Sequence, residues 1–329
     1  MKVNLNEAAE FILNNDNYLI TCHIEPDGDC LSSAISLGTA LRRLGKKVKM
    51  TVDSVIPDIY KKIPMICEIT ERVDFTEDDF DNLIVVDSSS PDRMGKYEKF
   101  LGKKTSVVID HHATNTEFGD YNWVDSSYAA AAQMVYELLV YFKIEFDPVL
   151  ATLNLLGIQT DTGFFKYSNT DERLLRTAAD LVGFGAKIYD NSSLILENNS
   201  IQEYKLMAMM IDNIEFRLDG ELAFSRVTVD MIKKCGCSEN DGHGLISNLR
   251  SISGVETAIL LTESEDDLIK VSFRSKKWFD VAKVAFKFGG GGHVRASGCG
   301  IKGNIDEITD RIVNYTVEEM KNSKEYQEE

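Results

Sequence analysis

Residues 82–112 read NLIVVDSSSPDRMGKYEKFLGKKTSVVIDHH and contain two short runs that are apolar almost throughout. The first run, NLIVVD, ends in Asp87, and the second, TSVVID, ends in Asp110 followed by two histidines. Near-continuous apolar runs rich in β-branched residues are typical of strands buried on both faces of a parallel sheet. The stretch therefore predicts two central strands, each ending in a side chain that can bind a metal ion.

The same pattern extends over the first half of the chain, where short β-branched runs alternate with stretches of helical periodicity. The helical stretches cover residues 30–44, 127–142, 147–158 and 171–184. Such alternation is typical of a mostly parallel sheet covered by helices on both faces. For the last of these helices, Asn169 or Thr170 is expected as the N-cap. We therefore expect residues 1–185 to form an α/β domain.

The pattern changes in the second half. Residues 186–200 lose clear periodicity and are interpreted as a linker between domains. Beyond the linker, a helix over 201–213, a hairpin at the Asp219-Gly220 turn and two further strands predict a smaller α+β domain over 201–329. In this arrangement we expect the active site to lie in the cleft between the two domains.

Composition limits the classes of function. The 329 residues, 43% of them hydrophobic, suit about two globular domains, and no apolar stretch approaches the roughly 20 residues needed to cross a membrane. The N-terminus is polar and amphipathic, unlike a signal peptide, so a cytoplasmic location and no membrane partner are expected. The net charge of -17 disfavours long nucleic acids, duplexes included, because their affinity comes mainly from Lys and Arg. Short anionic ligands remain compatible with this charge.

The six cysteines are few for this length, and none has the paired spacing of a zinc site or a redox dithiol. We interpret them as reduced structural thiols. Cys22 and Cys30, which flank the segment HIEPDGD, are accordingly interpreted as packing residues.

Possible metal ligands gather at the ends of the predicted strands and of one helix. They are His23, Asp27, Asp29, Asp87, Asp110, His111, His112 and Asp161. A single aspartate at a strand end more often caps a helix, but four caps would not need three histidines beside them. Carboxylate and imidazole ligands without cysteine suit Mn²⁺, Mg²⁺ or Fe²⁺. Because there are too many carboxylates for one ion, the set predicts two ions, an arrangement that serves displacement at phosphorus.

Five ordered motifs then carry a family resemblance. HIEPDGD, VVDSSSPDRMG, VVIDHH and GIQTDTG resemble the four motifs of the DHH phosphoesterase superfamily, and GGGGHVRASG resembles the hallmark of its DHH-associated C-terminal domain. The resemblance covers nearly the whole chain, and the layout is similar to the stand-alone bacterial nanoRNase type, the NrnA-like oligoribonucleases. One departure is Ser32, which stands where family members often have glycine; no ligand is missing.

The resemblance implies a role for each ligand. His23 and Asp27 would hold one ion, Asp29 and His111 the other, with Asp161 at or between the two and Asp87 as the bridge. Mn²⁺ is the expected ion and Mg²⁺ the alternative. His112 would contact the scissile phosphate or the leaving oxygen, or else only orient its neighbours. Asp110 is expected to support the imidazoles, since metal-bound histidines usually donate their other N–H to an acceptor.

The second domain is expected to hold the substrate. Glycines let a backbone approach a phosphate closely, and an arginine makes planar, charge-assisted contacts with it. The expected substrate-binding residues are Arg274, Gly290, Gly291, Gly292, His293 and Arg295. The alternative interpretations are a flexible linker for the glycines and a surface arginine for Arg274.

The function implied is hydrolysis of short oligoribonucleotides, including linear dinucleotides such as pApA and pGpG, to mononucleotides, and removal of the 3′-phosphate of pAp. A metal-bridging hydroxide would attack in line. The alternatives are a RecJ-like single-strand DNA exonuclease, which resembles a longer chain, and a nucleotide-binding sensor without catalysis. A type II pyrophosphatase lacks the GGGGH run. The preferred substrate, the cleavage polarity and the physiological ion stay open, and a homodimer is expected by analogy only.

Overall fold

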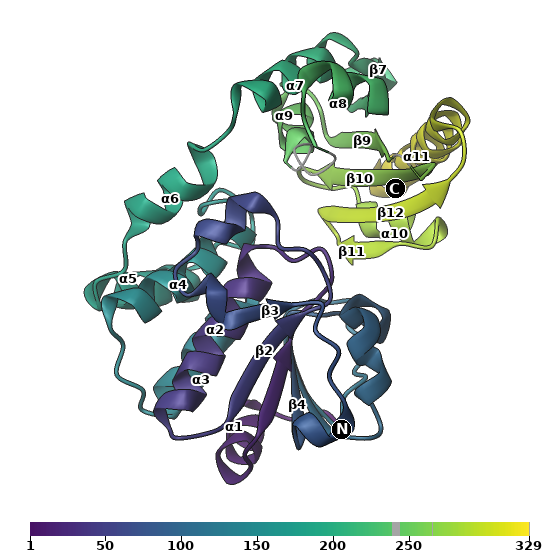
Figure 1. Ribbon diagram of the computed structural model, residues 1–329. Coiled ribbons are helices and arrows are strands. Elements are labelled where there is room, and N and C mark those ends of the chain that lie inside the picture. Colours follow the sequence, from purple (N-terminus) through teal and green to yellow (C-terminus); the bar gives the residue numbers. More distant parts are fainter. Residues whose placement is uncertain (239–243, 265, 329) are drawn as a thin grey trace. The chain divides into compact units, whose positions relative to one another are not determined.

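The computed structural model describes residues 1–238, 244–264 and 266–328, with side chains described as far as residue 323. The chain forms two compact units, Met1–Asn198 and Asn199–Glu329, coloured purple to teal and green to yellow in Figure 1. Within the described residues, no helix is both long and apolar enough to span a bilayer.

The first unit is built on a sheet of six parallel strands in the order β3-β2-β1-β4-β5-β6. The strands are β1 (Tyr18–Thr21), β2 (Val48–Val52), β3 (Ile69–Glu71), β4 (Asn82–Val86), β5 (Thr105–Asp110) and β6 (Tyr121–Val124). Every residue of β4 is buried, as is β5 apart from its first residue. The two apolar runs thus form neighbouring inner strands, and the predicted parallel α/β sheet is confirmed.

Helices cover one face of this sheet. They are α1 (Leu5–Asn14), α2 (Gly28–Arg43), α3 (Ala131–Tyr141), α4 (Pro148–Asp161), α5 (Glu172–Gly183) and α6 (Ile188–Leu196). Residues of α1 to α4 share one hydrophobic core with β1, β2, β4 and β5. The helix α4 lies inside the helical layer, and its residues are buried continuously from Leu150 to Gln159. This burial explains why the sequence of α4 is mostly apolar on all sides. The opposite face packs against the 3₁₀ segment η4 (Pro91–Phe100), whose Met94, Tyr97 and Phe100 are buried.

Two local predictions need correction. The N-cap of α5 is Asp171, whose carboxylate accepts a hydrogen bond from the Leu174 N–H, whereas Asn169 donates to the carbonyl of Ala129 instead. The segment 186–200, without clear periodicity in the sequence, contains α6. Asn191 anchors this helix to α4 by donating to the Thr152 carbonyl and to the Gln159 side chain.

The second unit contains a mixed sheet in the order β11-β12-β10-β9-β8-β7, in which only β8 and β9 are parallel among the described pairs. Its strands are β7 (Glu215–Arg217), β8 (Leu222–Val227), β9 (Thr257–Glu263), β10 (Leu268–Ser275), β11 (Gly291–His293) and β12 (Ala296–Lys302). The predicted hairpin joins β7 to β8, and Asp219 and Gly220 take the positive φ angles (+53° and +96°) that such a turn requires.

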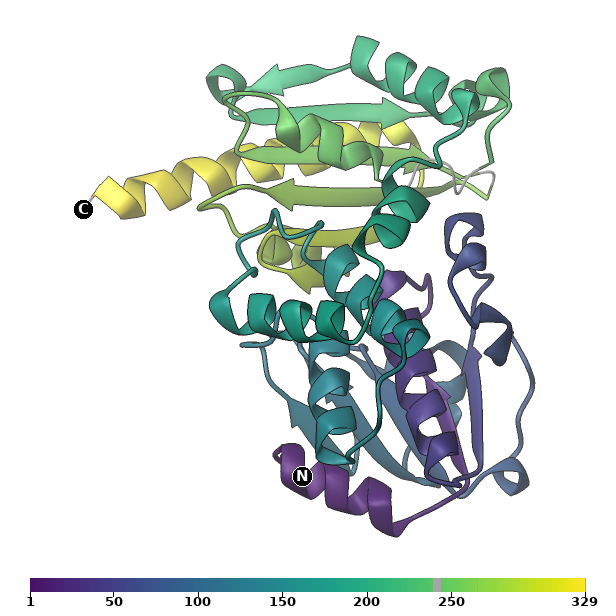
Figure 2. The same ribbon diagram turned by 90° about the vertical axis from the view of Figure 1, so that its left-hand side faces the viewer.

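Helices lie against both faces of this second sheet. They are α7 (Ile201–Asp212), α8 (Val229–Cys235), α9 (Leu245–Ser251), α10 (Val281–Lys287) and α11 (Ile305–Glu328). One hydrophobic cluster joins α10 and α11 to the sheet, and another joins α7, α8 and α9 to it. Figure 2 shows α11 running along the sheet and continuing past it to the C-terminus. The smaller α+β unit predicted from the sequence is confirmed.

Candidate metal centre

The eight predicted ligand-type residues of the first unit lie on segments that converge at one edge of its sheet. His23 follows β1, Asp87 follows β4, and Asp110 is the last residue of β5. Because the strands are parallel, their carboxyl ends share an edge, and the loops there can converge on one site. The start of α2 and the end of α4 reach the same edge, since a Cβ added at Gly28 would meet the side chain of Thr160.

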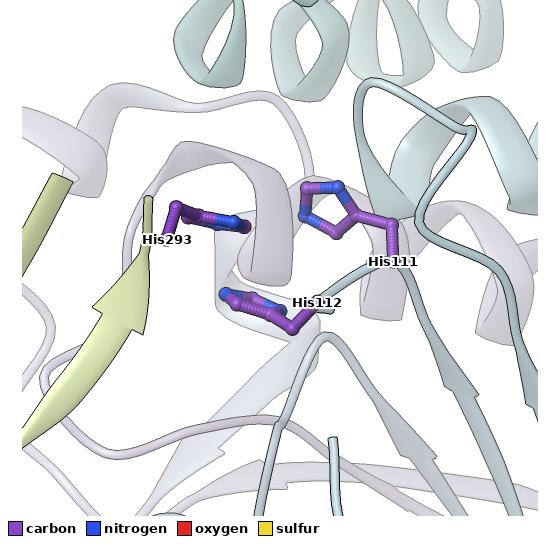
Figure 3. A group of neighbouring side chains, drawn as sticks. All are labelled: His111, His112 and His293. Carbon is purple, nitrogen blue, oxygen red and sulfur yellow. The ribbon is translucent and has the colours of Figure 1, made fainter. Parts of the chain in front are cut away.

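His111 and His112 leave the end of β5 together, as Figure 3 shows, with their ring centroids 4.8 Å apart. The Nε2 atom of His111 lies 3.4 Å from Asp87 Oδ1, 3.4 Å from Asp161 Oδ2 and 3.8 Å from Asp29 Oδ2. His111 is therefore surrounded by carboxylates from three different segments.

His23 has a similar environment on the other side of Asp87. Its Nε2 atom lies 3.7 Å from Asp27 Oδ2 and 3.7 Å from Asp87 Oδ2. Two compact groups of donor atoms result, each within 4.8 Å: His23, Asp27, Cys30 and Asp87 form one, and Asp29, Asp87 and His111 form the other. Asp87 belongs to both groups and turns one oxygen toward each histidine.

Asp29 is fixed by the start of α3. Its Oδ2 accepts a hydrogen bond from the Ala131 N–H (2.7 Å), and its Oδ1 accepts from the Ala132 N–H (2.9 Å) and the Ser33 hydroxyl (3.2 Å). Burial nevertheless raises the pKa of Asp29 well above the usual range, and the charges of Asp87 and Asp161 raise it further. A divalent cation would neutralise this repulsion.

Asp87 supplies the test of whether the site fits a metal. Its side chain is 2% exposed, and among the described residues its Oδ1 accepts no hydrogen bond. A buried carboxylate oxygen without a hydrogen-bond partner costs free energy. A cation bound beside Oδ1 would remove this cost. The backbone of Asp87 is also held at φ +54°, a conformation that costs energy and is common at functional sites. Carboxylate and imidazole donors together fit a divalent ion.

Asp110 supports His112, and these two residues form a further group of donor atoms with Asp87. Its Oδ1 accepts from His112 Nδ1 (2.7 Å) and its Oδ2 from the Asn115 amide (2.6 Å). Burial opposes ionisation of Asp110, but the neighbouring histidines and Asn115 outweigh it and hold its pKa at about 2. The carboxylate therefore stays ionised and fixes the tautomer of His112.

In the second unit, the four-glycine run is an ordered strand edge. Gly291, Gly292 and His293 form β11, which pairs with β12. A Cβ at Gly290 would lie 2.1 Å from the Gly298 carbonyl oxygen, and Gly292 has φ +135°, so both positions need glycine. Arg274 lies on β10, directly opposite Ala296 of β12.

The side chain of Arg295 forms hydrogen bonds with the backbone. Its guanidinium donates to the carbonyls of Lys277 and Phe279. The buried carboxylate of Glu256 accepts hydrogen bonds from the backbone N–H groups of Lys277, Trp278 and Phe279. Arg295 and Glu256 thus hold the turn 277–279 from both sides, a role that the sequence did not indicate.

Two residues near the metal centre were missed by the sequence analysis. Cys30, interpreted as a packing residue, has its sulfur in the His23 group of donor atoms. Arg93 places its Nη2 atom 3.1 Å from His23 Nδ1, and among the described residues no carboxylate lies within 4.0 Å of its guanidinium. The sequence did contain a signal for Arg93, because it is the one arginine of the motif VVDSSSPDRMG in a chain with a net charge of -17.

Comparison with known proteins agrees with this architecture. Residues 17–158 match the N-terminal domain of the DHH family, and residues 224–318 match the DHHA1 domain. A protein of Thermus thermophilus named bifunctional oligoribonuclease and PAP phosphatase NrnA is 33% identical over 92% of this chain and 89% of its own length. The protein of the same name from Bacillus subtilis is 29% identical over 87% and 90%.

The fold is also shared with a solved structure. An exopolyphosphatase-related protein from Bacteroides fragilis superposes with a TM-score of 0.88 at 22% identity, covering 97% of this chain and 96% of that one. Both family domains therefore occur in this chain, and the similarity extends over most of the length of each of these relatives. The chain belongs to the DHH family, with the family's N-terminal domain followed by a DHHA1 domain.

Proposed function

We propose that the protein is a metal-dependent phosphoesterase that hydrolyses short oligoribonucleotides to mononucleotides and removes the 3′-phosphate of pAp. The observation that carries this proposal is the pair of donor groups that share the buried carboxylate of Asp87. The relatives that match both domains are named oligoribonuclease and PAP phosphatase, which supports the substrate class. The net charge of -17 also favours short ligands over long nucleic acids.

We assign the metal ligands by these groups. His23, Asp27 and Asp87 would hold one ion, and Asp29, Asp87 and His111 the other. Asp161, whose Oδ2 lies 3.4 Å from His111 Nε2, would complete the second position. Mn²⁺ suits this mixture of oxygen and nitrogen donors best, and Mg²⁺ is the alternative. Two such ions, when bound, supply an acidified water and neutralise charge on the phosphate.

The protein's own groups orient the reaction. Asp110 accepts a hydrogen bond from the Nδ1–H of His112. This leaves Nε2 as the ring atom that would contact the substrate. A protonated His112 would donate from Nε2 to the phosphate or to the departing ribose oxygen, offsetting its charge. Asn115 donates to both Asp110 and the Ser88 carbonyl, so the carboxylate that orients His112 is itself fixed.

The second unit would bind the rest of the nucleotide. The backbone of Gly290, Gly291 and Gly292, with Arg274 and His293, would contact phosphate and sugar. Arg295 would act with Glu256 to hold the turn that carries Lys277 and Trp278. A homodimer and a cytoplasmic location stay predictions, which light scattering and cell fractionation can check.

A turnover comparison tests the proposal. Metal-free protein would be reconstituted with Mn²⁺ and assayed side by side on pAp, pApA, pGpG, RNAs of increasing length and long single-stranded DNA. We expect turnover of pAp and the dinucleotides, a decline as the RNA lengthens, and no turnover in excess chelator. Preference for long single-stranded DNA would indicate a RecJ-like enzyme. Tight binding of pAp with no hydrolysis under any ion would indicate a sensor.

A further inference from the structure

The thiol of Cys30 lies among the atoms proposed to hold a metal ion. Its Sγ and the donor atoms of His23, Asp27 and Asp87 all lie within 4.8 Å of one another. Cys30 is fully buried and belongs to the hydrophobic core, as its predicted packing role requires, and its sulfur also reaches the polar donor atoms of His23, Asp27 and Asp87. The sequence analysis had set this cysteine aside because it lacks a second cysteine at metal-site spacing.

Local structure fixes the position of this thiol. Asp27 is the N-cap of α2, and its Oδ1 accepts a hydrogen bond from the Cys30 N–H at 3.0 Å. The Cys30 sulfur lies 3.6 Å from the Asp27 carbonyl oxygen. Cys30 is thus held in the first turn of α2 by the same aspartate that offers its other oxygen to His23.

A second observation points to a ligand at the neighbouring position, which shares Asp87 with this one. Asp87 is 2% exposed, and its Oδ1 accepts no hydrogen bond among the described residues. The Oδ2 atom of this carboxylate lies 3.7 Å from His23 Nε2. A buried carboxylate whose unsatisfied Oδ1 faces His111 and whose Oδ2 faces His23 is the environment of a cation site that both donor groups share.

The two donor groups differ in one respect. The His23 group contains sulfur, whereas the group of Asp29, Asp87 and His111 offers only oxygen and nitrogen. Thiolate sulfur is a soft ligand that favours Zn²⁺ and other thiophilic ions, whereas carboxylates suit Mg²⁺ and Mn²⁺.

We propose that Cys30 is a further ligand of the ion held by His23, Asp27 and Asp87, so that the two metal positions differ in preference. The position with Cys30 accepts Mn²⁺ but binds thiophilic ions such as Zn²⁺, Co²⁺ or Cd²⁺ more tightly, whereas the Asp29 position lacks this preference. This proposal rests on the two-ion site of the proposed function. On binding, the S–H bond of Cys30 breaks, its proton passes to water, and the sulfur lone pair forms the metal bond without any change of oxidation state.

The position that contains Cys30 should therefore prefer Zn²⁺ to Mn²⁺. We expect Cys30→Ser to weaken Zn²⁺ binding by at least about 10-fold, roughly 1.4 kcal/mol, because the soft ligand is replaced by a hydroxyl. Mn²⁺ binding should change by less than about threefold, because Mn²⁺ gains little from a thiolate.

Titration of the metal-free, full-length protein with Co²⁺ tests the proposal directly. Visible d–d bands report binding of Co²⁺ at either position, and a near-ultraviolet sulfur-to-cobalt charge-transfer band reports a thiolate ligand. We expect wild type and Cys22→Ser to show both, and Cys30→Ser to keep the d–d bands but lose the charge-transfer band. Cys22 is the matched control because it is also fully buried and lies next to His23.

The possible failures are distinguishable. Visible bands without a charge-transfer band in wild type overturn the role of Cys30 and leave the proposed function standing. A charge-transfer band that persists in Cys30→Ser overturns it too, and points to another thiol such as the exposed Cys67. Absence of any cobalt binding overturns the two-ion site itself. If Cys30→Ser does not fold, cadmium NMR of wild type decides, since a resonance in the range of oxygen and nitrogen ligands alone contradicts the proposal.

Discussion

In the metal centre, the Oδ1 atom of Asp87 lies 3.4 Å from the Nε2 atom of His111. The other oxygen of Asp87 lies 3.7 Å from His23, so one carboxylate faces both histidines. If it bridges two ions, Asp87→Asn should lower metal content and reduce kcat on the order of 100-fold or more, because the bridging charge is lost while the shape is kept. Metal analysis and pAp turnover measure both effects. Asp92→Asn, an exposed position on η4, is the control, and equal losses in the two variants would contradict the bridge.

Asp110 and His112 should act as one unit. Asp110→Asn removes the acceptor that selects the His112 tautomer. We expect kcat to fall by about 10² to 10⁴-fold, as for loss of an oriented acid–base group, with metal content unchanged. The double variant Asp110→Asn/His112→Ala should be no worse than His112→Ala alone, because each change removes the same function. Independent, multiplying losses would show that Asp110 acts elsewhere.

Gly157 lets α4 pass close to Asp29, one of the proposed ligands. A Cβ at this position would lie 2.6 Å from the Ala132 Cβ and 2.8 Å from Asp29 Oδ1. We expect Gly157→Ala to cost about 1–3 kcal/mol of unfolding free energy through overpacking. It should also weaken Mn²⁺ binding, because Asp29 must move. Gly183→Ala, at the open end of α5 with no atom within 4 Å of the added group, is the matched control in thermal denaturation and metal titration. Similar behaviour of the two variants would refute the close-approach argument.

Arg93 is expected to contact the substrate phosphate. Its guanidinium lies beside His23, and its backbone carbonyl accepts from the Ile24 N–H (2.7 Å), so the residue is anchored at the site. Loss of a charge-assisted contact costs roughly 1.5–3 kcal/mol, and we expect Arg93→Ala to raise KM for pAp by about 10-fold or more. Arg93→Lys should recover part of the loss, since it keeps the charge but not the planar fork. Steady-state kinetics decide, with the exposed Arg72→Ala as control; unchanged KM would place Arg93 outside the substrate site.

The metal-free protein should lose stability as the pH rises. Burial raises the pKa of Asp161 from 3.8 to about 6. The charge of His111 lowers this pKa, but the charges of Asp87 and Asp27 raise it further. The folded state then binds a proton that the unfolded state releases, so the free energy of unfolding falls between about pH 4 and pH 6. Burial lowers the pKa of His111, but the charge of Asp161 and other carboxylates outweighs it, so its pKa is raised and its stabilisation is lost as the pH rises further.

Thermal denaturation in chelator measures this trend. We expect the Tm of the metal-free protein to decline from about pH 5 to pH 8. Asp161→Asn should make this decline shallower. Bound Mn²⁺ should reverse it, because the ion competes with protons for the same side chains. Asp110, with a pKa of about 2, contributes a loss only at much lower pH. A Tm that rises with pH across this window in the metal-free protein would show that the carboxylates do not share a buried site.

The sequence alone predicted most of the fold of the first unit. The apolar runs that became β4 and β5 determined the parallel sheet, and the parallel sheet requires that Asp87 and His111 reach one edge. The 3₁₀ segment η4 was not predicted, because its buried Met94, Tyr97 and Phe100 recur every three residues, the period of a 3₁₀ helix, and Gly95 interrupts the helical backbone between them. The N-cap of α5 was placed wrongly because the helix begins at Glu172, so the cap falls on Asp171, while the amide of Asn169 donates to the carbonyl of Ala129 in a distant loop.

The side-chain roles that were missed depend on contacts remote in sequence. The cysteine-spacing rule tests thiols only against other thiols, whereas Cys30 meets Asp87 through the fold. Arg295, predicted to bind phosphate, donates to the backbone of a turn some sixteen to eighteen residues away. For Gly292, the sequence suggested that glycine lets the backbone approach a phosphate. The structure gives another reason for glycine there, since Gly292 pairs with β12 and has a φ of +135°.

Metal stoichiometry measured together with pAp turnover tests the central claim most directly. Metal-free protein would be titrated with Mn²⁺ while bound ions per chain and hydrolysis are followed in the same samples. The account predicts two ions per chain, no turnover before Mn²⁺ is added, and activity that rises as the second position fills. One ion per chain at full activity, or full turnover of pAp in excess chelator, would contradict it.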